Sequence, residues 1–574
     1  MTTSSSQTMG DGERPETERR ADVFRTPKSW SRPDVLIASL GINILALMLP
    51  MAVLQVYDRI IPNQAVDTFT ILMLGMLGVA VLEALLRIFR SVILAWSGAR
   101  FEHRESLKAL NHILHADTLA FNKDPSANYL SRMQAVEEIH QFYSGQSMLL
   151  LMDFPFILLY LGLIWIISGS LILVPLTLLL VFAVASFSLG RRLHKALKER
   201  HKTDTNRQNF LTEVLSGIHT VKSMAMEALM LRRYERLQAQ SAERVQELAN
   251  INSVVQGFGT TFSQLAMVSF VGFGAIFVID GTLTVGALAA GTMLSGRVLQ
   301  PGLKAMSLWT QFQGVRLALG RCQEIYEMPL EVAGNIAEEQ PVQGHLELRD
   351  VTFKYPEQDK LLLRGITLDI PSGGAVGITG INGAGKSTLI SILTGFVQPL
   401  EGEVILDNNS LRDHDQEFLR QQIGFMPQHG ILYEGTILEN MTLFREGDVL
   451  EHAIELSREL GLDEIIATMP EGLDTMIGGS AVDTLSEGVR QKIVMVRSLV
   501  GHPKVILFDD ANASFDIKND IKLLKMMKKF RGDRTMVVVS HRPSFLGLCE
   551  RQYELHNGLL QQQRSNKLQM VFNR

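Results

Sequence analysis

The segment Gly380–Thr388, with the sequence GINGAGKST, decides the fold of the C-terminal half of this chain. It matches the phosphate-loop pattern of Gly, four residues, Gly, Lys and Ser or Thr. The apolar stretch Ala375–Ile378 before it is typical of a strand, and an apolar run with helical spacing follows it. Glycines in such a loop let backbone N–H groups surround a phosphate, and the helix that begins there points its positive end at the anion. The pattern predicts an α/β nucleotide-binding domain.

The same region supplies side chains for a nucleotide and its metal ion. Lys386 carries the positive charge expected at the β- and γ-phosphates, and the Ser387 hydroxyl is a ligand type that Mg²⁺ accepts. Further along, the apolar run Val505–Phe508 ends in Asp509, an acid placed to hold Mg²⁺ through water. The nucleotide-binding residues expected from these motifs are Gly380, Asn382, Gly383, Gly385, Lys386, Ser387, Thr388 and Asp509.

The chain before about Ala305 has a different composition. At 574 residues, 46% of them hydrophobic, the chain is too long for one compact domain, and its long apolar runs all lie in this first part. Six runs of about 20 residues are each long enough to cross a hydrocarbon core of roughly 30 Å. We expect membrane spans at Val35–Val56, Thr68–Ile88, Ser147–Ile167, Leu171–Leu189, Val255–Ile279 and Leu283–Leu303.

The connections between these spans predict their orientation. Three are short and nearly free of basic residues, whereas two, about 89–146 and 190–254, are long and charged. A cluster of Lys and Arg between Arg191 and Lys202 begins the second long connection. Because basic residues concentrate on the cytoplasmic side, both long connections and both termini are expected in the cytoplasm.

Two ionisable residues, Asp153 and Arg297, fall inside predicted spans at similar depth. Charges within a membrane are costly and need partners or water. We expect the two side chains to face the bundle interior and to pair, or to line a water-filled path. The alternative is that each is satisfied locally near the membrane surface.

Composition excludes several classes of protein. The formal net charge of −5 provides no basic footprint for nucleic acid, so no nucleic-acid partner is expected. The two cysteines, Cys322 and Cys549, cannot form a disulfide framework or a metal cluster, which fits a reducing, cytosolic location. The first 30 or so residues are rich in Ser, Thr, Glu and Arg and read as a disordered tail.

Four further motifs accompany the phosphate loop, and with them the region 344–563 resembles the ATP-binding cassette family of transporters. They are VTFKYP around Tyr355, GFMPQ ending at Gln428, TLSEGVRQKI at Thr484–Ile493, and VVVSHR around His541. The resemblance covers essentially this whole region and implies ATP and Mg²⁺ as cofactors.

The resemblance implies a role for each of these residues. Tyr355 would stack on adenine, Gln428 would sense Mg²⁺ and the attacking water, and His541 would clamp the γ-phosphate. In the signature motif, Ser486, Glu487 and Gly488 would contact ATP held by an opposite subunit, and Asp516 would line the dimer interface. The Mg²⁺ ligands implied are Ser387, Gln428 and Asp509, and the catalytic residues implied are Asp510, His541 and Gln428.

Two motifs depart from the family pattern. Asp510 stands where the family usually has a glutamate as catalytic base, and Glu487 and Val489 replace a glycine and a glutamine of the signature. A carboxylate displaced by about 1 Å can lose on the order of a hundredfold in rate. Glu487 adds bulk where backbone must approach closely, and adds like charge near a phosphate. We expect ATP binding with slow hydrolysis, ordinary turnover being the alternative.

Six spans ahead of one cassette resemble an exporter half-transporter, which implies a dimer. The segments Leu49–Pro62 (LPMAVLQVYDRIIP), Met152–Phe156 (MDFPF) and Leu294–Pro301 (LSGRVLQP) resemble the type I protein secretion branch, and within it the protease-exporter subgroup, which lacks an N-terminal peptidase domain. That resemblance implies a bacterial inner-membrane protein with a cytoplasmic cassette. It also implies a membrane-fusion protein, an outer-membrane channel and a secreted protein substrate as partners.

The fold class expected is therefore an all-α transmembrane domain of six helices followed by an α/β cassette with a helical subdomain. A heterodimer with a second half-transporter chain is favoured, and a homodimer stays open. A lipid or small-molecule exporter, and a weakly hydrolysing ATP-binding structural subunit, are the alternative functions. The expected regions are a cytoplasmic tail 1–33, a transmembrane domain 34–310, a linker 311–343, the cassette 344–563 and a tail 564–574.

Overall fold

The computed structural model describes residues 33–331, 334, 336, 342–478 and 485–563. The chain divides into two compact units. The first comprises Met1–Ala116 and Ala120–Leu330, and the second comprises Asp117–Leu119 and Glu331–Arg574. The two predicted tails lie almost entirely outside the described residues.

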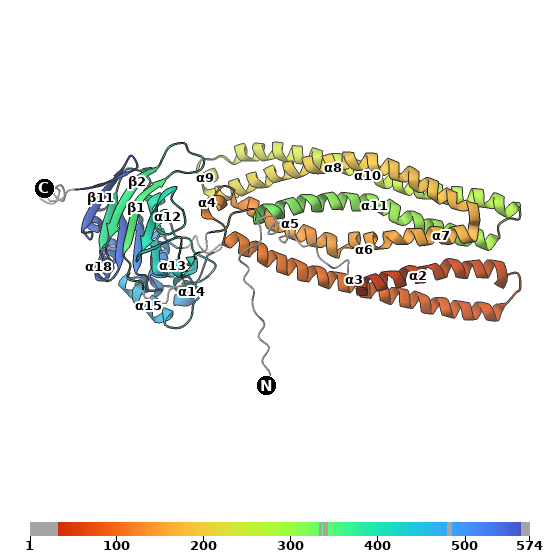
Figure 1. Ribbon diagram of the computed structural model, residues 1–574, viewed down its shortest axis with the longest axis horizontal. Helices are drawn as coiled ribbons and strands as arrows, with labels where there is room; N and C mark the ends of the chain where they lie inside the picture. The colour runs from red at the N-terminus through yellow and green to blue at the C-terminus, as the bar shows by residue number, and fades with distance from the viewer. Residues whose placement is uncertain (1–32, 332–333, 335, 337–341, 479–484, 564–574) are drawn as a thin grey trace, which may run out of the picture. The chain divides into compact units, whose positions relative to one another are not determined.

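The first unit is built from helices, several of them very long (Figure 1). Its regular α-helices are α2 (Pro33–Gln55), α3 (Val66–Leu114), α5 (Ser126–Ser144), α6 (Gln146–Asp153), α7 (Ile157–Ser168), α8 (Leu173–Ser216), α9 (Ile218–Ser223), α10 (Glu227–Ile279) and α11 (Val285–Tyr326). The short helix α4 (Thr118–Phe121) has residues in both units. Three short irregular turns join some of them, a π-turn at Val56–Ile60 and 3₁₀ turns at Phe154–Phe156 and Gly169–Ile172.

The six predicted spans fall on these helices and on the short turns that join them, except for the first two residues of the last span. By length and composition, four segments of the described chain could cross a membrane: Pro33–Ile60, Val66–Leu114, Asn128–Val184 and Glu227–Ile279. The third segment contains the third predicted span and most of the fourth, and Gly169, with φ of 54°, lies at the turn between α7 and α8. Figure 1 shows the chain reversing direction there. The sixth predicted span lies on α11.

The start of α11 is held by Asp58, which lies in the segment Leu49–Pro62. Thr284 caps the helix, and its hydroxyl accepts a hydrogen bond from the Ala287 N–H over 3.0 Å. Asp58 accepts from the Thr284 hydroxyl over 2.6 Å and from the Gly286 N–H over 2.9 Å. An acidic side chain at a helix N-terminus is stabilised by the helix dipole, so Asp58 ties the end of α2 to α11.

A polar network lies where the third predicted span is broken. Asp153 ends α6, and one of its carboxylate oxygens accepts from the guanidinium of Arg90 on α3 over 2.7 Å and from the Asn43 amide on α2 over 3.1 Å. The Asn43 amide oxygen accepts from the Tyr160 hydroxyl over 2.7 Å. Arg90 is only 4% exposed and donates a further bond to Ser39 over 2.9 Å. Charges this buried are stable only when paired and hydrogen-bonded.

The expected partner of Asp153 was wrong. Its ion pair is with Arg90, and Arg297 on α11 is instead an electrostatic neighbour of the Tyr160 hydroxyl. Depth in the span suggested that Asp153 and Arg297 could meet, but the packing of α3 beside the break puts a different guanidinium within reach. The Asp153 carboxylate does face neighbouring helices, because its partners Asn43 and Arg90 lie on α2 and α3.

The second unit contains three sheets and their covering helices. An antiparallel sheet has the order β2-β1-β4-β5, a larger sheet the order β12-β11-β3-β10-β9-β6, and β7 and β8 form a pair. The strands are β1 (Leu346–Phe353), β2 (Leu363–Ile370), β3 (Ala375–Thr379), β4 (Glu401–Leu406), β5 (Asn409–Ser410), β6 (Ile423–Met426), β7 (Gly435–Thr436), β8 (Met476–Ile477), β9 (Val505–Asp509), β10 (Thr535–Val539), β11 (Arg551–His556) and β12 (Leu559–Gln562). The helices are α12 (Lys386–Leu393), α13 (Gln416–Gln422), α14 (Ile437–Thr442), α15 (Val449–Glu459), α16 (Asp463–Ile466), α17 (Glu487–Leu499), α18 (Ile517–Phe530) and α19 (Pro543–Leu546).

Strand order in the larger sheet explains how distant motifs meet. Strands β3, β10, β9 and β6 are neighbours and run parallel. Their carboxyl ends therefore lie along one edge of the sheet, where ligands of open α/β sheets bind. The segments that leave this edge carry Gly380, His541, Asp510 and Gln428.

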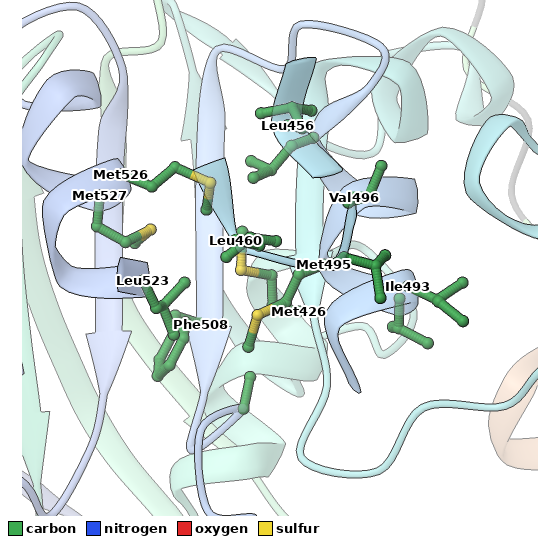
Figure 2. Packing of buried hydrophobic residues seen from close by; sticks show 14 of the residues in the cluster. Met426, Leu456, Leu460, Ile493, Met495, Val496, Phe508, Leu523, Met526 and Met527 are labelled. Atoms are coloured by element: carbon green, nitrogen blue, oxygen red, sulfur yellow. The ribbon is translucent and has the colours of Figure 1, made fainter. Parts of the chain in front are cut away.

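A buried cluster joins the larger sheet to the helices beside it. Figure 2 shows Phe508 of β9 and Met426 of β6 in one cluster with Leu523 of α18 and Met495 of α17. The Phe508 ring also stacks on Phe545 of α19, with centroids 5.4 Å apart. Fully burying a side chain of this size contributes roughly 1.5–3 kcal/mol. The strand that ends in Asp509 is therefore fixed to the helix that begins at the signature motif.

Candidate functional site

The phosphate loop has the backbone that its glycines predict. Gly383 and Gly385 have φ values of 80° and 102°, which side chains with a Cβ rarely adopt. The helix α12 begins directly after Gly385, so the first N–H groups of the helix face the loop. The Lys386 ammonium is buried and donates to the carbonyls of Gly380 and Ile381 over 2.8 and 3.1 Å. This concave loop with a cation at its centre suits a polyphosphate.

A cavity of about 790 Å³ opens beside the loop. It brings together eleven of the predicted site residues: Tyr355, Asn382, Gly383, Gly385, Lys386, Ser387, Thr388, Gln428, Asp509, Asp510 and His541. These residues come from the β1–β2 connection, the phosphate loop and the carboxyl ends of β6, β9 and β10. The volume is in the range expected for a small-molecule site.

One end of the cavity has an aromatic wall. The Tyr355 ring packs edge-on against Phe353, with centroids 5.1 Å apart, and its hydroxyl lies 3.0 Å from the Thr388 hydroxyl. Both contacts fix the ring next to the loop. A ring held in this way offers a face on which a planar base can stack.

Oxygen donors gather at the carboxyl ends of the strands. Ser387, Gln428 and Asp509 all line the cavity, and hydroxyl, amide and carboxylate oxygens are the ligands that Mg²⁺ prefers. Burial raises the pKa of the Asp509 carboxyl, and the charge of Asp510 adds to the rise, while the Ser387 hydroxyl and Lys386 oppose it. A cation at this position would offset the desolvation of that carboxylate, so the donor set fits Mg²⁺.

Asp510 is held in a rare backbone conformation beside His541. Its φ is 42°, and its N–H donates to the Val539 carbonyl over 2.9 Å. One of its carboxylate oxygens accepts from the His541 N–H over 3.3 Å, and the other lies 3.7 Å from the imidazole Nε2. The His541 side chain is half exposed, so its imidazole remains accessible from the cavity.

The signature residues lie elsewhere in the same unit. Ser486 precedes α17, and the Glu487 carboxylate is 3.3 Å from the Arg490 guanidinium, an ion pair one turn apart. Asp516 caps α18 by accepting from the Asn519 N–H over 2.8 Å. Within the described part of the chain, Ser486, Glu487, Gly488 and Asp516 do not line the cavity. Thr484, the first residue of the quoted signature, lies outside that part.

Five further residues, which the sequence motifs did not indicate, also line the cavity: Gln358, Leu362, Asn512, Ala513 and Arg542. Each of them lies close in the sequence to a predicted site residue, and this proximity could have indicated them. Gln358 and Leu362 follow Tyr355 in the connection to β2, Asn512 and Ala513 follow Asp510, and Arg542 follows His541 directly.

Two family models match the chain. The model of the ABC transporter transmembrane region matches residues 35–301, and the ABC transporter model matches residues 363–513. Among curated proteins, the alpha-hemolysin translocation ATP-binding protein HlyB of Escherichia coli O157:H7 is 30% identical over 540 residues, which is 93% of this chain and 76% of that protein. The cyclolysin secretion/processing ATP-binding protein CyaB of Bordetella pertussis (strain Tohama I) is 30% identical over 525 residues, or 92% and 74% of the two chains.

A third relative and a solved structure extend the comparison. The leukotoxin export ATP-binding protein LtxB of Aggregatibacter actinomycetemcomitans is 28% identical over 519 residues, covering 90% of this chain and 73% of the relative. A bacterial Atm1-family ABC exporter solved with ATP bound superposes with a TM-score of 0.82, covers 97% of each chain and is 20% identical in sequence. At that identity the structural likeness shows the fold alone. The expected fold class, a helical exporter domain followed by an α/β cassette, is confirmed.

Proposed function

The chain belongs to the ABC transporter family, and from that premise we propose that it exports an unfolded protein or peptide in a type I secretion system. The relatives that support this proposal are proteins of hemolysin translocation, cyclolysin secretion and leukotoxin export. The observation that carries the ATP-driven part is the cavity that gathers Lys386, Ser387, Asp509, Asp510 and His541.

The residues that line the cavity have distinct roles in this proposal. The adenine of ATP stacks on Tyr355, and the phosphates lie in the loop against Lys386. Ser387, Gln428 and Asp509 supply the oxygen atoms for Mg²⁺, which neutralises charge on the phosphate oxygens when it is bound. The remaining pair, Asp510 and His541, faces the place of the γ-phosphate.

Asp510 orients the attacking water and accepts its proton, and His541 donates to the γ-phosphate. Positioning dominates such phosphoryl transfer, because the phosphoryl group itself needs little covalent help from the protein. The shorter carboxylate of Asp510 therefore slows hydrolysis more than it weakens binding.

The position of the signature residues supports a dimer. Ser486, Glu487 and Gly488 stand apart from their own chain's cavity, which fits a contact with ATP held by a second subunit. In a homodimer, each site would combine Asp510 with the altered signature. In a heterodimer with an intact relative, each site carries one of the two defects, and we favour this arrangement.

The proposal includes a location and partners. Its transmembrane helices place the chain in a membrane, which we propose to be the bacterial inner membrane with both termini and the cassette in the cytoplasm. A membrane-fusion protein and an outer-membrane channel complete the secretion path. The two departures at Asp510 and Glu487 favour one alternative, a structural subunit that binds ATP while its partner hydrolyses it.

Co-purification from the native membrane, with identification of every bound chain, tests the proposal. We expect a second cassette chain, a membrane-fusion protein and a secreted protein. A lipid or small molecule as the only photolabelled cargo would contradict protein export. Export is then compared after Lys386→Ala in this chain and the matching change in its partner, with the exposed Lys529→Ala as control. Export that survives Lys386→Ala, but not the partner's change, identifies the structural subunit.

A further inference from the structure

Arg542 lies in the loop that follows β10, and its side chain contacts the segment that follows β9. Its guanidinium forms an ion pair with Asp520 on α18 and donates to the carbonyls of Phe515 and Ala513 over 3.2 and 3.5 Å. The residue before it is His541, and the segment it holds begins at Asp510. Arginine suits this position because its planar fork can serve several acceptors at once.

The held segment has little regular structure of its own. It leaves β9 in two tight turns, in which the Ala513 N–H donates to the Asp510 carbonyl and the Phe515 N–H to the Asn512 carbonyl, each over 3.0 Å. These turns direct the Ala513 and Phe515 carbonyls toward Arg542. The segment ends at Asp516, the N-cap residue of α18. Its shape therefore determines where Asp510 and Asp516 lie relative to each other.

Asp520 extends the network into the protein interior. Its carboxylate also accepts from the Asn512 side-chain amide over 2.9 Å, and Asn512 is only 1% exposed. The Asp520 side chain is itself 14% exposed. The Arg542 side chain is 33% exposed, so the network is shielded from water mainly at Asn512 and Asp520. Removing Arg542 or Asp520 leaves these shielded groups with fewer partners, which costs more than the loss of a fully exposed ion pair.

The backbone of Arg542 is anchored independently of its side chain. Its N–H donates to the Ser540 hydroxyl over 3.2 Å, and its carbonyl accepts from the Phe545 N–H over 3.1 Å. The Phe545 ring stacks on Phe508, the residue before Asp509. A change of the side chain alone should therefore free the segment without unfolding the loop that carries His541.

From this geometry we infer that Arg542 and Asp520 are positioning residues of the ATP site. Together they hold the segment Asp510–Asp516 at a fixed distance from His541, and so link the hydrolytic carboxylate to the residue expected at the dimer interface. The inference rests on the proposed ATPase function. Its physical basis is that a displacement of about 1 Å can lower the rate on the order of a hundredfold.

The test uses the full chain in its assembled transporter in lipid nanodiscs. The variants are Arg542→Ala, Asp520→Ala, their double mutant and Arg542→Lys. Lys529→Ala is the matched control, because Lys529 lies on the same helix α18 and forms an exposed ion pair with Glu459. ATP turnover, nucleotide affinity from a fluorescent analogue and the fraction trapped with vanadate are measured for each.

We expect Arg542→Ala and Asp520→Ala to lower kcat by about tenfold to a hundredfold, while KM changes little. The double mutant should be no worse than either single mutant, because the two residues act as one unit. Arg542→Lys should recover part of the rate, since one ammonium can reach the carboxylate but not both carbonyls. Hydrogen exchange at the Ala513 and Phe515 amides should become faster in Arg542→Ala and stay unchanged in Lys529→Ala.

Three results would overturn the inference: a kcat within twofold of the unmutated protein, additive losses in the double mutant, or a loss of nucleotide affinity that accounts for the whole effect. Absence of ATP turnover in the unmutated transporter would instead contradict the proposed function. In that case, unchanged exchange at the Ala513 and Phe515 amides in Arg542→Ala would still refute the positioning role.

Discussion

The imidazole Nε2 of His541 lies 3.7 Å from one carboxylate oxygen of Asp510, and the His541 N–H donates to the other oxygen over 3.3 Å. One oxygen of the shorter carboxylate therefore accepts a hydrogen bond from the loop that follows β10, and the other lies near the imidazole of the same loop. A longer side chain rooted at the same backbone would reach further into the cavity.

Asp510→Glu should raise ATP turnover. The added methylene moves the carboxylate by about 1 Å, and the expected gain is on the order of tenfold, with little change in ATP affinity. Steady-state hydrolysis by the purified transporter measures it. Asp510→Asn is the control, which should bind ATP and lose hydrolysis. A rate unchanged by Asp510→Glu would mean that the aspartate is already well placed.

Glu487→Gly should also raise turnover, by restoring close backbone approach at the signature. Glu487 is paired with Arg490 over 3.3 Å, so its charge is partly offset within its own helix. The variant Glu487→Gln separates the two effects, because it removes the charge and keeps the bulk. We expect Glu487→Gln to give less than half of the gain of Glu487→Gly. Equal gains would identify charge as the whole defect.

Asp509→Asn should make the protein more resistant to heat while abolishing hydrolysis. Burial raises the pKa of the Asp509 carboxyl, so the folded protein holds this proton more tightly than the unfolded chain. Stability from the group is present below the pKa of the unfolded chain and is lost as pH rises through the higher pKa of the folded state. At neutral pH, the uncharged side chain of the Asp509→Asn variant avoids the loss of folding stability that deprotonation of Asp509 causes.

The thermal measurement is made in EDTA without nucleotide, at pH 7.5 and at lower pH. We expect the Asp509→Asn variant to melt roughly 2–4 °C higher at pH 7.5 for each kcal/mol gained. The difference should shrink as pH falls toward the pKa of an ordinary aspartate. A difference in melting temperature that grew on acidification would contradict a raised pKa of Asp509 in the folded protein.

Reversal of one charge in the Arg90–Asp153 pair should lower the amount of folded protein in the membrane. Breaking a buried pair costs about 3–5 kcal/mol, because the remaining charge has no partner. The double reversal Arg90→Asp with Asp153→Arg should recover part of that loss. The matched control is Arg297→Asp with Asp153→Arg, which should recover nothing, since Arg297 neighbours Tyr160 instead. Fluorescence-detected size exclusion measures all variants.

Local sequence rules were sufficient for much of the cassette. A phosphate loop dictates its own backbone, as Gly383 and Gly385 show, and an apolar strand that ends in an acid places Asp509 at a predictable edge. The roles of Gln428 and His541 could not be derived in that way. Their place in one cavity depends on the order of β6, β9 and β10. The expected roles of both residues came from the family resemblance.

Pairings between distant side chains were beyond local rules. Nothing in the spacing of Arg90 and Asp153 indicates that α3 packs beside the break after α6, and span depth favoured Arg297. Arg542 was overlooked for a related reason. Its acceptors are two carbonyls and a carboxylate on another element, so only the folded loop reveals what it binds.

The long helix α3 has a mechanical consequence. It runs unbroken for 49 residues, about 73 Å at the usual rise, and Arg90 stands at its middle with 24 residues on either side. A stiff rod clamped at its centre is a lever with equal arms. Any tilt of α3 about the Arg90–Asp153 clamp therefore displaces its two ends by equal amounts in opposite directions, without breaking a hydrogen bond within the helix.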